Sequence, residues 1–206
     1  MNPNIIVIDD FYDDPWEIYQ QAVNTEYNQL NDDPLYPGRN SICDFSNDEL
    51  YSKLNKILNA KVIPCNNTGN GHFRYALEGD KGDLSVHCDM NEGFSGVIYL
   101  TLPTNCHNRS GTNFYIHKQT GLDMFPNDGQ VLSYGYSKSE ELYQGFVSND
   151  SNDESVWEKY CTVKMKYNRL VLFNSRLWHS PDKSFGNKIE NSRLVQLIFS
   201  RHDTKQ

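Results

Sequence analysis

From residue 60 onward, short β-type runs alternate with turns and long loops, and this pattern constrains the fold more than any other feature. Runs rich in Val, Ile, Phe and Tyr recur between turn residues, as is typical of a sandwich, barrel or jelly roll. The predicted strands are residues 61–65, 72–77, 84–89, 94–101, 111–117, 160–166, 169–173 and 193–200. We interpret residues 140–158, which are acidic and rich in Ser and Asn, as a surface loop.

The N-terminal part of the chain carries helical signals instead. Asp14 is a suitable N-cap, Pro15 suits the first helical position, and Glu17 can complete a capping box, so a helix to about Asn24 is predicted. A second capping box at residues 46–49 precedes leucines and an isoleucine at helical spacing. Two helices are therefore predicted before the β-rich part begins.

These patterns predict a mainly β protein with flanking helices. The length of 206 residues fits a single domain, residues 1–206. Within it, residues 1–59 supply an N-terminal strand and helices that pack on a β core of residues 60–206.

Charge and cysteine usage limit the class of protein. The net charge is −8, and the absence of a Lys/Arg cluster argues against nucleic acid as a partner. No apolar run approaches the roughly 20 residues of a membrane span, and the N-terminus lacks the pattern of a signal peptide. The five cysteines show no CxxC spacing and are predicted to be free thiols, so we expect a cytoplasmic protein. The sequence does not indicate an oligomeric state.

His87 and Asp89 lie two residues apart in the predicted strand 84–89. Alternate residues of a strand project to the same side, so these two side chains project together and Cys88 points the other way. An imidazole and a carboxylate in this relation can occupy adjacent positions around a metal ion. A second histidine would complete a 2-His-1-carboxylate set, which leaves coordination positions open and is typical of non-haem Fe(II) oxygenases.

Two residues further along the chain strengthen this interpretation. His179 opens a predicted strand after an apolar run and a polar turn, and Arg193 starts another strand fourteen residues later. An arginine that faces the interior of a barrel is unfavourable unless it meets an anion. A dicarboxylate co-substrate that chelates the metal at one end would supply that anion at the other.

The pattern HCD at 87–89, LWHS at 177–180 and Arg193 resembles the H-x-D…H…R signature of the Fe(II)/2-oxoglutarate-dependent dioxygenases. Further segments are similar to the prolyl-hydroxylase-like branch of that superfamily and to its small members. They are IIVIDDFYDDP (5–15), GVIYLT (96–101), SGTNFY (110–115), KQTG (118–121) and NRLVLF (168–173).

The resemblance implies a double-stranded β-helix (jelly-roll) core and an enzyme that hydroxylates a C–H bond. Fe(II) would be held by His87, Asp89 and His179, and 2-oxoglutarate by Arg193, with O2 as the second co-substrate. Tyr99 would either contact the same carboxylate or serve as a core aromatic. The implied substrate is a peptide or protein side chain, or a free amino acid.

Several alternatives stay open. The spacing from His179 to Arg193 is longer than in prolyl hydroxylases, and Lys188 is a competing anchor, although it lies in a polar loop. A zinc-dependent hydrolase would use the same ligands with one bound water and would need no arginine anchor. A non-catalytic ligand-binding jelly roll would need neither metal nor anchor.

Arg74 and Trp178 are candidates either for the lining of a substrate pocket or for packing. Residues 28–40 and 137–158 are long enough to close over the site as lids.

Overall fold

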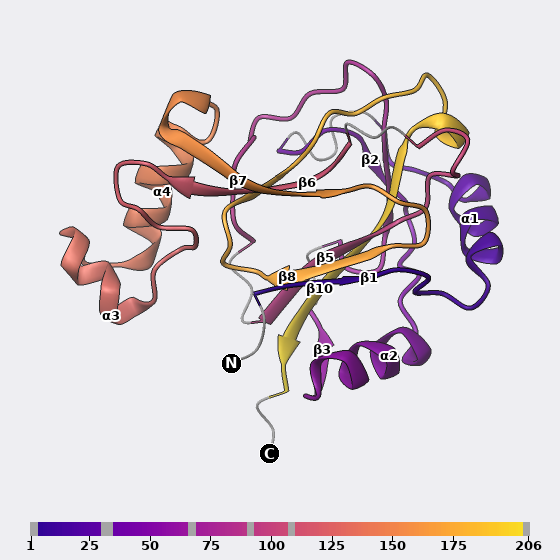
Figure 1. The fold of residues 1–206 in the computed structure, drawn as a ribbon, viewed down its shortest axis with the longest axis horizontal. Helices are drawn as coiled ribbons and strands as arrows, with labels where there is room; N and C mark the ends of the chain where they lie inside the picture. Colours follow the sequence, from indigo (N-terminus) through magenta and orange to yellow (C-terminus); the bar gives the residue numbers. More distant parts are fainter. Residues whose placement is uncertain (1–3, 30–34, 66–68, 90–92, 107–109, 204–206) are drawn as a thin grey trace.

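The computed structural model describes residues 4–29, 35–65, 69–89, 93–106 and 110–203. In these ranges the named strands form two antiparallel sheets, with helices at opposite ends of the molecule (Figure 1). No helix in the same ranges is both long enough and apolar enough to cross a bilayer.

Within the described residues, the larger sheet has seven strands in the order β1-β8-β5-β10-β4-β2, and β3 pairs with β10 off this path. The strands are β1 (Ile5–Ile8), β2 (Arg39–Asn40), β3 (Val62–Pro64), β4 (Phe73–Ala76), β5 (Gly93–Tyr99), β8 (Leu170–Asn174) and β10 (Arg193–His202). All of their pairings are antiparallel. Strand β10 therefore lies inside the sheet, between β5 and β4.

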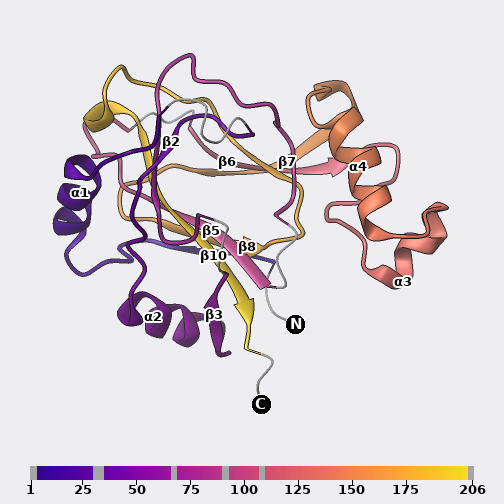
Figure 2. The same ribbon diagram turned by 180° about the vertical axis from the view of Figure 1, so that it is seen from behind.

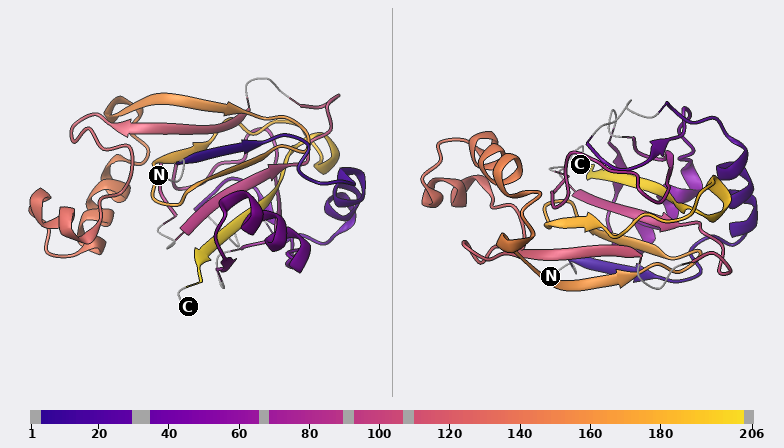
Figure 3. Two further views of the ribbon diagram at one scale, coloured as in Figure 1. Left: turned by 60° about the horizontal axis from the view of Figure 1, so that its bottom comes forward. Right: turned by 90° about the horizontal axis from the view of Figure 1, so that it is seen from above.

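The smaller sheet has the order β7-β6-β9, formed by β6 (Gly111–His117), β7 (Trp157–Lys164) and β9 (His179–Pro181). The antiparallel pair of β6 and β7 forms a separate layer from β5 and β10 (Figure 3). Phe114 of the smaller sheet packs with Val171 and Val195 of the larger one. The prediction of a mainly β fold with flanking helices and a jelly-roll core is confirmed.

The two predicted N-terminal helices are present as α1 (Pro15–Asn24) and α2 (Asp48–Leu58). The Asp14 carboxylate accepts a hydrogen bond from the Glu17 amide at 3.1 Å and caps α1. The Asn47 side chain accepts one from the Leu50 amide at 2.8 Å and caps α2. Each cap satisfies an amide that has no partner inside its helix, so the local sequence fixes where each helix begins.

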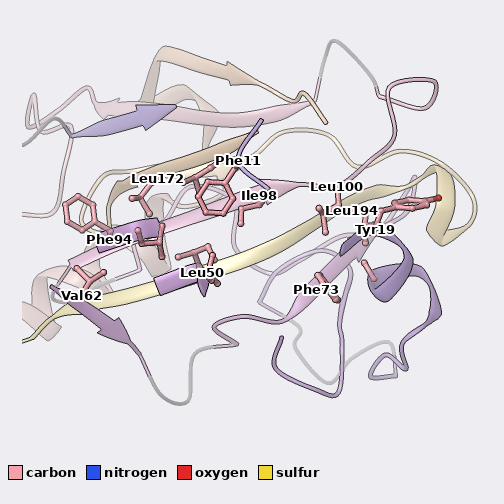
Figure 4. Packing of buried hydrophobic residues seen from close by; sticks show 14 of the residues in the cluster. Phe11, Tyr19, Leu50, Val62, Phe73, Phe94, Ile98, Leu100, Leu172 and Leu194 are labelled. Atoms are coloured by element: carbon pink, nitrogen blue, oxygen red, sulfur yellow. The ribbon is translucent and has the colours of Figure 1, made fainter. Parts of the chain in front are cut away.

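A first hydrophobic core lies between these helices and the larger sheet (Figure 4). Leu50 and Leu54 of α2 pack in one cluster with Ile98 of β5, Leu172 of β8 and Leu194 of β10. These side chains are at most 2 % exposed. At about 1.5–3 kcal/mol for each fully buried Leu or Ile, this cluster is a principal source of stability.

The connection from β6 to β7 contains a helical insertion, residues 125–156. It contains α3 (Asp128–Val131) and α4 (Ser139–Asp150), and it projects from the β core at the end opposite α1 (Figures 1 and 2). The expectation of a surface loop at residues 140–158 is therefore wrong. Helix α4 forms because Leu142 is fully buried in a cluster with Phe125 and Trp157.

The predicted strand at residues 84–89 is also absent. Only an isolated bridge, between His87 and His179, joins this segment to a strand. The neighbouring amides of Ser85 and Val86 donate to Ser151 in the helical insertion, at 3.0 and 3.1 Å. Because its backbone partners come from different elements, the segment does not form a regular ladder.

Candidate metal centre

The side chains of His87, Asp89 and His179 converge. One ligand atom from each of the three lies within 4.8 Å of the other two. Nε2 of His87 is 3.7 Å from Oδ1 of Asp89, and Nε2 of His179 is 3.5 Å from Oδ2 of the same carboxylate. Strand alternation predicted only that His87 and Asp89 project together, and the resemblance added His179. The structure brings all three together without a regular strand at 84–89.

Backbone hydrogen bonds hold the two histidines side by side. The His87 amide donates to the His179 carbonyl at 3.0 Å, and the His179 amide donates back at 2.8 Å. His179 begins β9 and is paired with Phe114 of β6, which ties the bridge to the smaller sheet. The Asp89 amide donates to the carbonyl of Ser175 at 2.9 Å. Residues far apart in sequence are thus fixed at one end of the jelly roll.

Each histidine ring is oriented by a carbonyl. Nδ1 of His87 lies 3.0 Å from the Ser85 carbonyl, and Nδ1 of His179 lies 2.9 Å from the Leu177 carbonyl. A carbonyl only accepts, so Nδ1 carries the proton in both rings, and Nε2 offers its lone pair toward Asp89. This is the arrangement by which proteins fix the tautomer of metal-binding histidines.

The electrostatics of the cluster match a divalent cation. Burial lowers the pKa of His87 from 6.5 to about 4, and His179 adds to this effect, so His87 is neutral at pH 7. Oδ2 of Asp89 is buried without a hydrogen-bond partner among the described residues. Two imidazoles and one carboxylate form the 2-His-1-carboxylate set that suits Fe(II) and leaves positions open. The residues present therefore fit the metal that the sequence implies.

Arg193 starts β10, where it is paired with Ala76 of β4, and its side chain is buried. One guanidinium nitrogen donates to the Gly111 carbonyl at 3.2 Å, while Nε has no hydrogen-bond partner among the described residues. Burial lowers the pKa of Arg193. A buried guanidinium with an unused donor is costly unless an anion binds to it.

Tyr99 and Thr112 lie next to this arginine. The Tyr99 ring stacks 5.9 Å from the Arg193 guanidinium carbon, and its hydroxyl is 2.7 Å from the Thr112 hydroxyl. Thr112 borders the cavity, and Tyr99 lies behind it in the core. The sequence analysis named Tyr99 but missed Thr112, although SGTNFY at 110–115 had drawn attention to this hairpin.

One cavity contains both ends of the site. The three converging side chains and Arg193 are among its lining residues, and so is Arg74. Trp178 is absent from the lining because it packs against Trp157 on the other side of the segment, at 5.2 Å between ring centroids. Of the two candidates for the pocket, Arg74 lines it and Trp178 is a packing residue.

Of Lys188 and the two proposed lid segments, only part of residues 28–40 lies at the metal cavity. The Lys188 side chain is 64 % exposed, is 3.8 Å from Glu190 and does not line the cavity. Tyr36 and Pro37 do line it, and the Tyr36 ring lies 4.6 Å from that of His87. The lid expectation for residues 28–40 falls partly outside the described residues, and no described residue of 137–158 lines the cavity.

The comparison with protein families adds one assignment. The family model of DUF6445, described as a family of unknown function, matches residues 2–194, and the chain therefore belongs to this family. No curated protein sequence matches the chain.

Solved structures share the fold at low identity. HygX from Streptomyces hygroscopicus, with nickel, 2-oxoglutarate and hygromycin B bound, is 10 % identical with a TM-score of 0.59, over 98 % of this chain and 84 % of HygX. HygX with nickel and 2-oxoglutarate bound is 11 % identical with a TM-score of 0.56, at the same coverage. A prolyl hydroxylase from Trichoplax adhaerens is 14 % identical with a TM-score of 0.44, over 98 % of this chain and 84 % of the hydroxylase, which does not assign the chain to the prolyl-hydroxylase-like branch.

Proposed function

We propose that the protein is an Fe(II)- and 2-oxoglutarate-dependent oxygenase that hydroxylates a C–H bond. One observation carries the proposal: a single cavity contains the donors of His87, Asp89 and His179 together with the buried guanidinium of Arg193. A metal site alone needs no such cation. A dicarboxylate that chelates the metal through one carboxylate needs a cation to pair with the other. The fold shared with HygX, whose structures contain nickel and 2-oxoglutarate, supports the same reading.

The roles of the residues follow from their positions. When bound, Fe(II), 2-oxoglutarate and O2 supply the oxidising chemistry. His87, Asp89 and His179 hold the metal from one side and leave the remaining positions open. Arg193 pairs with the far carboxylate of the co-substrate, and the Thr112 hydroxyl, oriented by Tyr99, provides a second polar contact.

Apolar side chains of the cavity exclude water from this arrangement. Phe173, Leu197 and Phe199 line it beside the polar groups. In a site with little water, the attraction between Arg193 and a carboxylate is stronger than in bulk solvent. The placement of Lys188 at the exposed surface supports Arg193 as the anchor.

We further propose a peptide or protein side chain as the substrate, in preference to a free amino acid. A groove of about 540 Å³ adjoins the metal cavity, and the two share Pro37, Pro181 and Ser184. Grooves of roughly 300–1,000 Å³ accept ligands larger than a single amino acid. The charged side chains of the groove are of both signs, which does not favour a polyanion. They are Lys81, Lys159, Lys183, Asp80, Glu154 and Asp182.

Anaerobic titration of the metal-free chain with Fe(II) and then 2-oxoglutarate tests the proposal. We expect a weak visible absorption band that requires both components, and conversion of 2-oxoglutarate to succinate once oxygen is admitted. A tight, colourless zinc complex that is indifferent to 2-oxoglutarate would instead favour a hydrolase. A chain that binds no metal would favour a non-catalytic jelly roll, and either result would overturn the proposal.

A further inference from the structure

The segment of residues 83–89 carries two of the three proposed metal ligands, yet no regular ladder holds it. On one side it is fixed by the bridge to His179 and by the bond from Asp89 to Ser175. On the other side its backbone is hydrogen-bonded to the helical insertion and to the carbonyl of Leu35. The position of this segment therefore depends on long-range contacts.

Ser151 of the helical insertion acts on the orientation of His87 through one intermediate residue. Its hydroxyl accepts a hydrogen bond from the Ser85 amide at 3.0 Å, and its carbonyl accepts one from the Val86 amide at 3.1 Å. The Ser85 carbonyl in turn accepts from Nδ1 of His87 at 3.0 Å. A shift of Ser85 would therefore rotate the imidazole and move Nε2 away from the metal position.

Tyr143 and Asn152 hold the two ends of the same segment. The Tyr143 hydroxyl on α4 donates to the carbonyl of Cys88, which stands between the two ligands His87 and Asp89, at 3.2 Å. The Asn152 side-chain amide donates to the Asp83 carbonyl at 2.7 Å. Both contacts come from the helical insertion and reach the backbone, so they fix position without touching the metal.

Apolar packing adds to these hydrogen bonds from the same direction. Val86 and Cys88, which flank His87, are buried in one cluster with Leu142 of α4. Trp178, which directly precedes His179, belongs to that cluster too. A single apolar cluster therefore packs behind both ligand-bearing segments, with the ligands on the cavity side and their neighbours on the insertion side.

We propose that the helical insertion is a positioning element of the metal centre, and that Tyr143 and Ser151 are positioning residues for His87 and Asp89. The inference rests on the proposed function, because it assumes that these side chains bind a metal. Ligand positions must hold within about 0.5 Å for tight binding, and outer partners of metal ligands typically contribute 10- to 100-fold in affinity. Here Tyr143 and Ser151 bond to the backbone beside the ligands, and Ser151 also acts, through Ser85, on the ring of His87.

Co(II) titration of the metal-free full-length chain tests the inference, with affinity and the visible spectrum of the bound ion as readouts. Tyr143→Phe and Ser151→Ala are expected to bind Co(II) about 10- to 100-fold more weakly and to change its spectrum. Ser151→Thr, which keeps the hydroxyl, is expected to restore most of the affinity.

Matched control variants lie outside the helical insertion and outside the lining of the metal cavity. Tyr51 on α2 donates to the Asn70 side chain at 3.0 Å, and the buried Ser41 hydroxyl accepts from the Phe73 amide at 3.0 Å. Tyr51→Phe and Ser41→Ala therefore remove the same chemical groups, and should lower thermal stability about as much while leaving Co(II) affinity and spectrum unchanged. Wild-type binding by Tyr143→Phe and Ser151→Ala, or an equal loss in the controls, would overturn the inference alone. A wild-type chain that binds no Co(II) would overturn the proposed function and the inference together.

Discussion

The two helical regions of this protein cover different parts of the β core. Helices α1 and α2 pack on the larger sheet, where Leu54 meets strands that are paired along their length. The helical insertion packs behind the ligand segments, where Leu142 meets a stretch joined to the sheet by a single described bridge. Both regions bury leucines completely, so they are similar in packing and differ in what they pack against.

Because of this difference, we expect one helical region to affect only the stability of the fold and the other to affect the geometry of the metal centre as well. In β5 and β10, ladder hydrogen bonds already fix each strand, so a helix on their outer face adds stability without setting the position of any side chain in the cavity. Residues 83–89 lack a ladder, so their geometry depends on separate contacts, and we propose that those from the insertion are decisive beside the bonds to His179, Ser175 and Leu35. Damage to the first region should reduce stability alone, and damage to the second should reduce both stability and metal affinity.

The largest effect is expected from removing one of the three proposed metal ligands. His179→Ala leaves two of three protein ligands, so metal binding and 2-oxoglutarate turnover should be lost. The fold should survive, because Leu177 and Phe185, which lie on either side of β9, are buried in the apolar cluster between the sheets. Far-UV circular dichroism, Co(II) titration and succinate formation check this. A His179→Ala chain that still couples 2-oxoglutarate loss to succinate would refute the assignment.

Arg193→Ala should weaken 2-oxoglutarate binding at one end of the cavity without weakening metal binding at the other. Arg193 belongs to the larger sheet and donates to the Gly111 carbonyl of β6, away from the three ligands, so metal affinity should stay nearly intact. Affinity for 2-oxoglutarate should fall by about 3–5 kcal/mol, as for truncation of one partner of a buried charge pair. Lys188→Ala should change it by about 0–1 kcal/mol, because its side chain is exposed. Calorimetric titration with 2-oxoglutarate distinguishes the two, and the reverse ranking would move the anchor to Lys188.

A pair of identical substitutions compares the two helical regions directly. Leu142→Ala in α4 and Leu54→Ala in α2 each remove a leucine that is 0 % exposed. Each should lower the free energy of unfolding by about 2–5 kcal/mol. Only Leu142→Ala should also weaken Co(II) binding, measured below the unfolding transition of both variants. Equal metal affinity in the two would erase the distinction between the regions.

The helical insertion should also loosen at mildly acidic pH. His117, at the end of β6, lies 3.2 Å from Asp150 of α4, and burial lowers the pKa of His117 below its ordinary value of 6.5. Because the unfolded chain then binds the proton first, stability falls as the pH drops below about 6.5, by at most about 1.4 kcal/mol per pH unit. Hydrogen exchange of residues 139–156 at pH 7 and 5.5 measures this. In His117→Gln the difference between the two pH values should shrink, and an unchanged difference would exclude His117 as its source.

The N-terminal region should respond only at much lower pH. Hydrogen bonds from Arg169 and Lys166 hold the pKa of Asp9, which follows β1, below its ordinary value of 3.8. The stabilisation is therefore present above about pH 4 and is lost as the pH falls further. Asp9 is 38 % exposed, so Asp9→Asn should cost only about 0–1 kcal/mol at pH 7 and almost nothing near pH 2. Urea unfolding at both values checks this, and an equal cost at both would contradict it.

The same comparison explains which helices are predictable from sequence. The Asp14 cap of α1 and the leucines of α2 are local signals, and the structure bears them out. The predicted capping box at 46–49 is wrong by one residue, because Asn47 caps α2 by accepting from the Leu50 amide. Helix α4, SEELYQGFVSND, is largely polar, and its burial of Leu142 depends on Val86 and Cys88, which are distant in sequence. Tertiary packing therefore decides that residues 139–150 are helical.

The candidate metal centre likewise combines residues that a sequence pattern predicts with residues whose place depends on tertiary packing. The H-x-D spacing and the later histidine are sequence patterns, and they place three donors together even though the expected strand at 84–89 does not form. Thr112 faces the cavity because β6 pairs with β9, and Tyr36 reaches His87 from a loop. The SGTNFY pattern marks the segment of Thr112 but not its role, and Tyr36 carries no local pattern, because each position depends on which strands and loops become neighbours.

The central position of β10 bears on the order in which the chain can fold as it is synthesised. Strands β4 and β5 are both paired to β10, and Arg193 starts that strand. A ribosome makes β4 and β5 about a hundred residues earlier, so their facing edges lack a partner until residues 193–202 emerge. Unpaired edges are prone to associate with other chains. We therefore expect nascent chains that end before β10 to depend on chaperones, and the sheet and the co-substrate anchor to be completed in one late step.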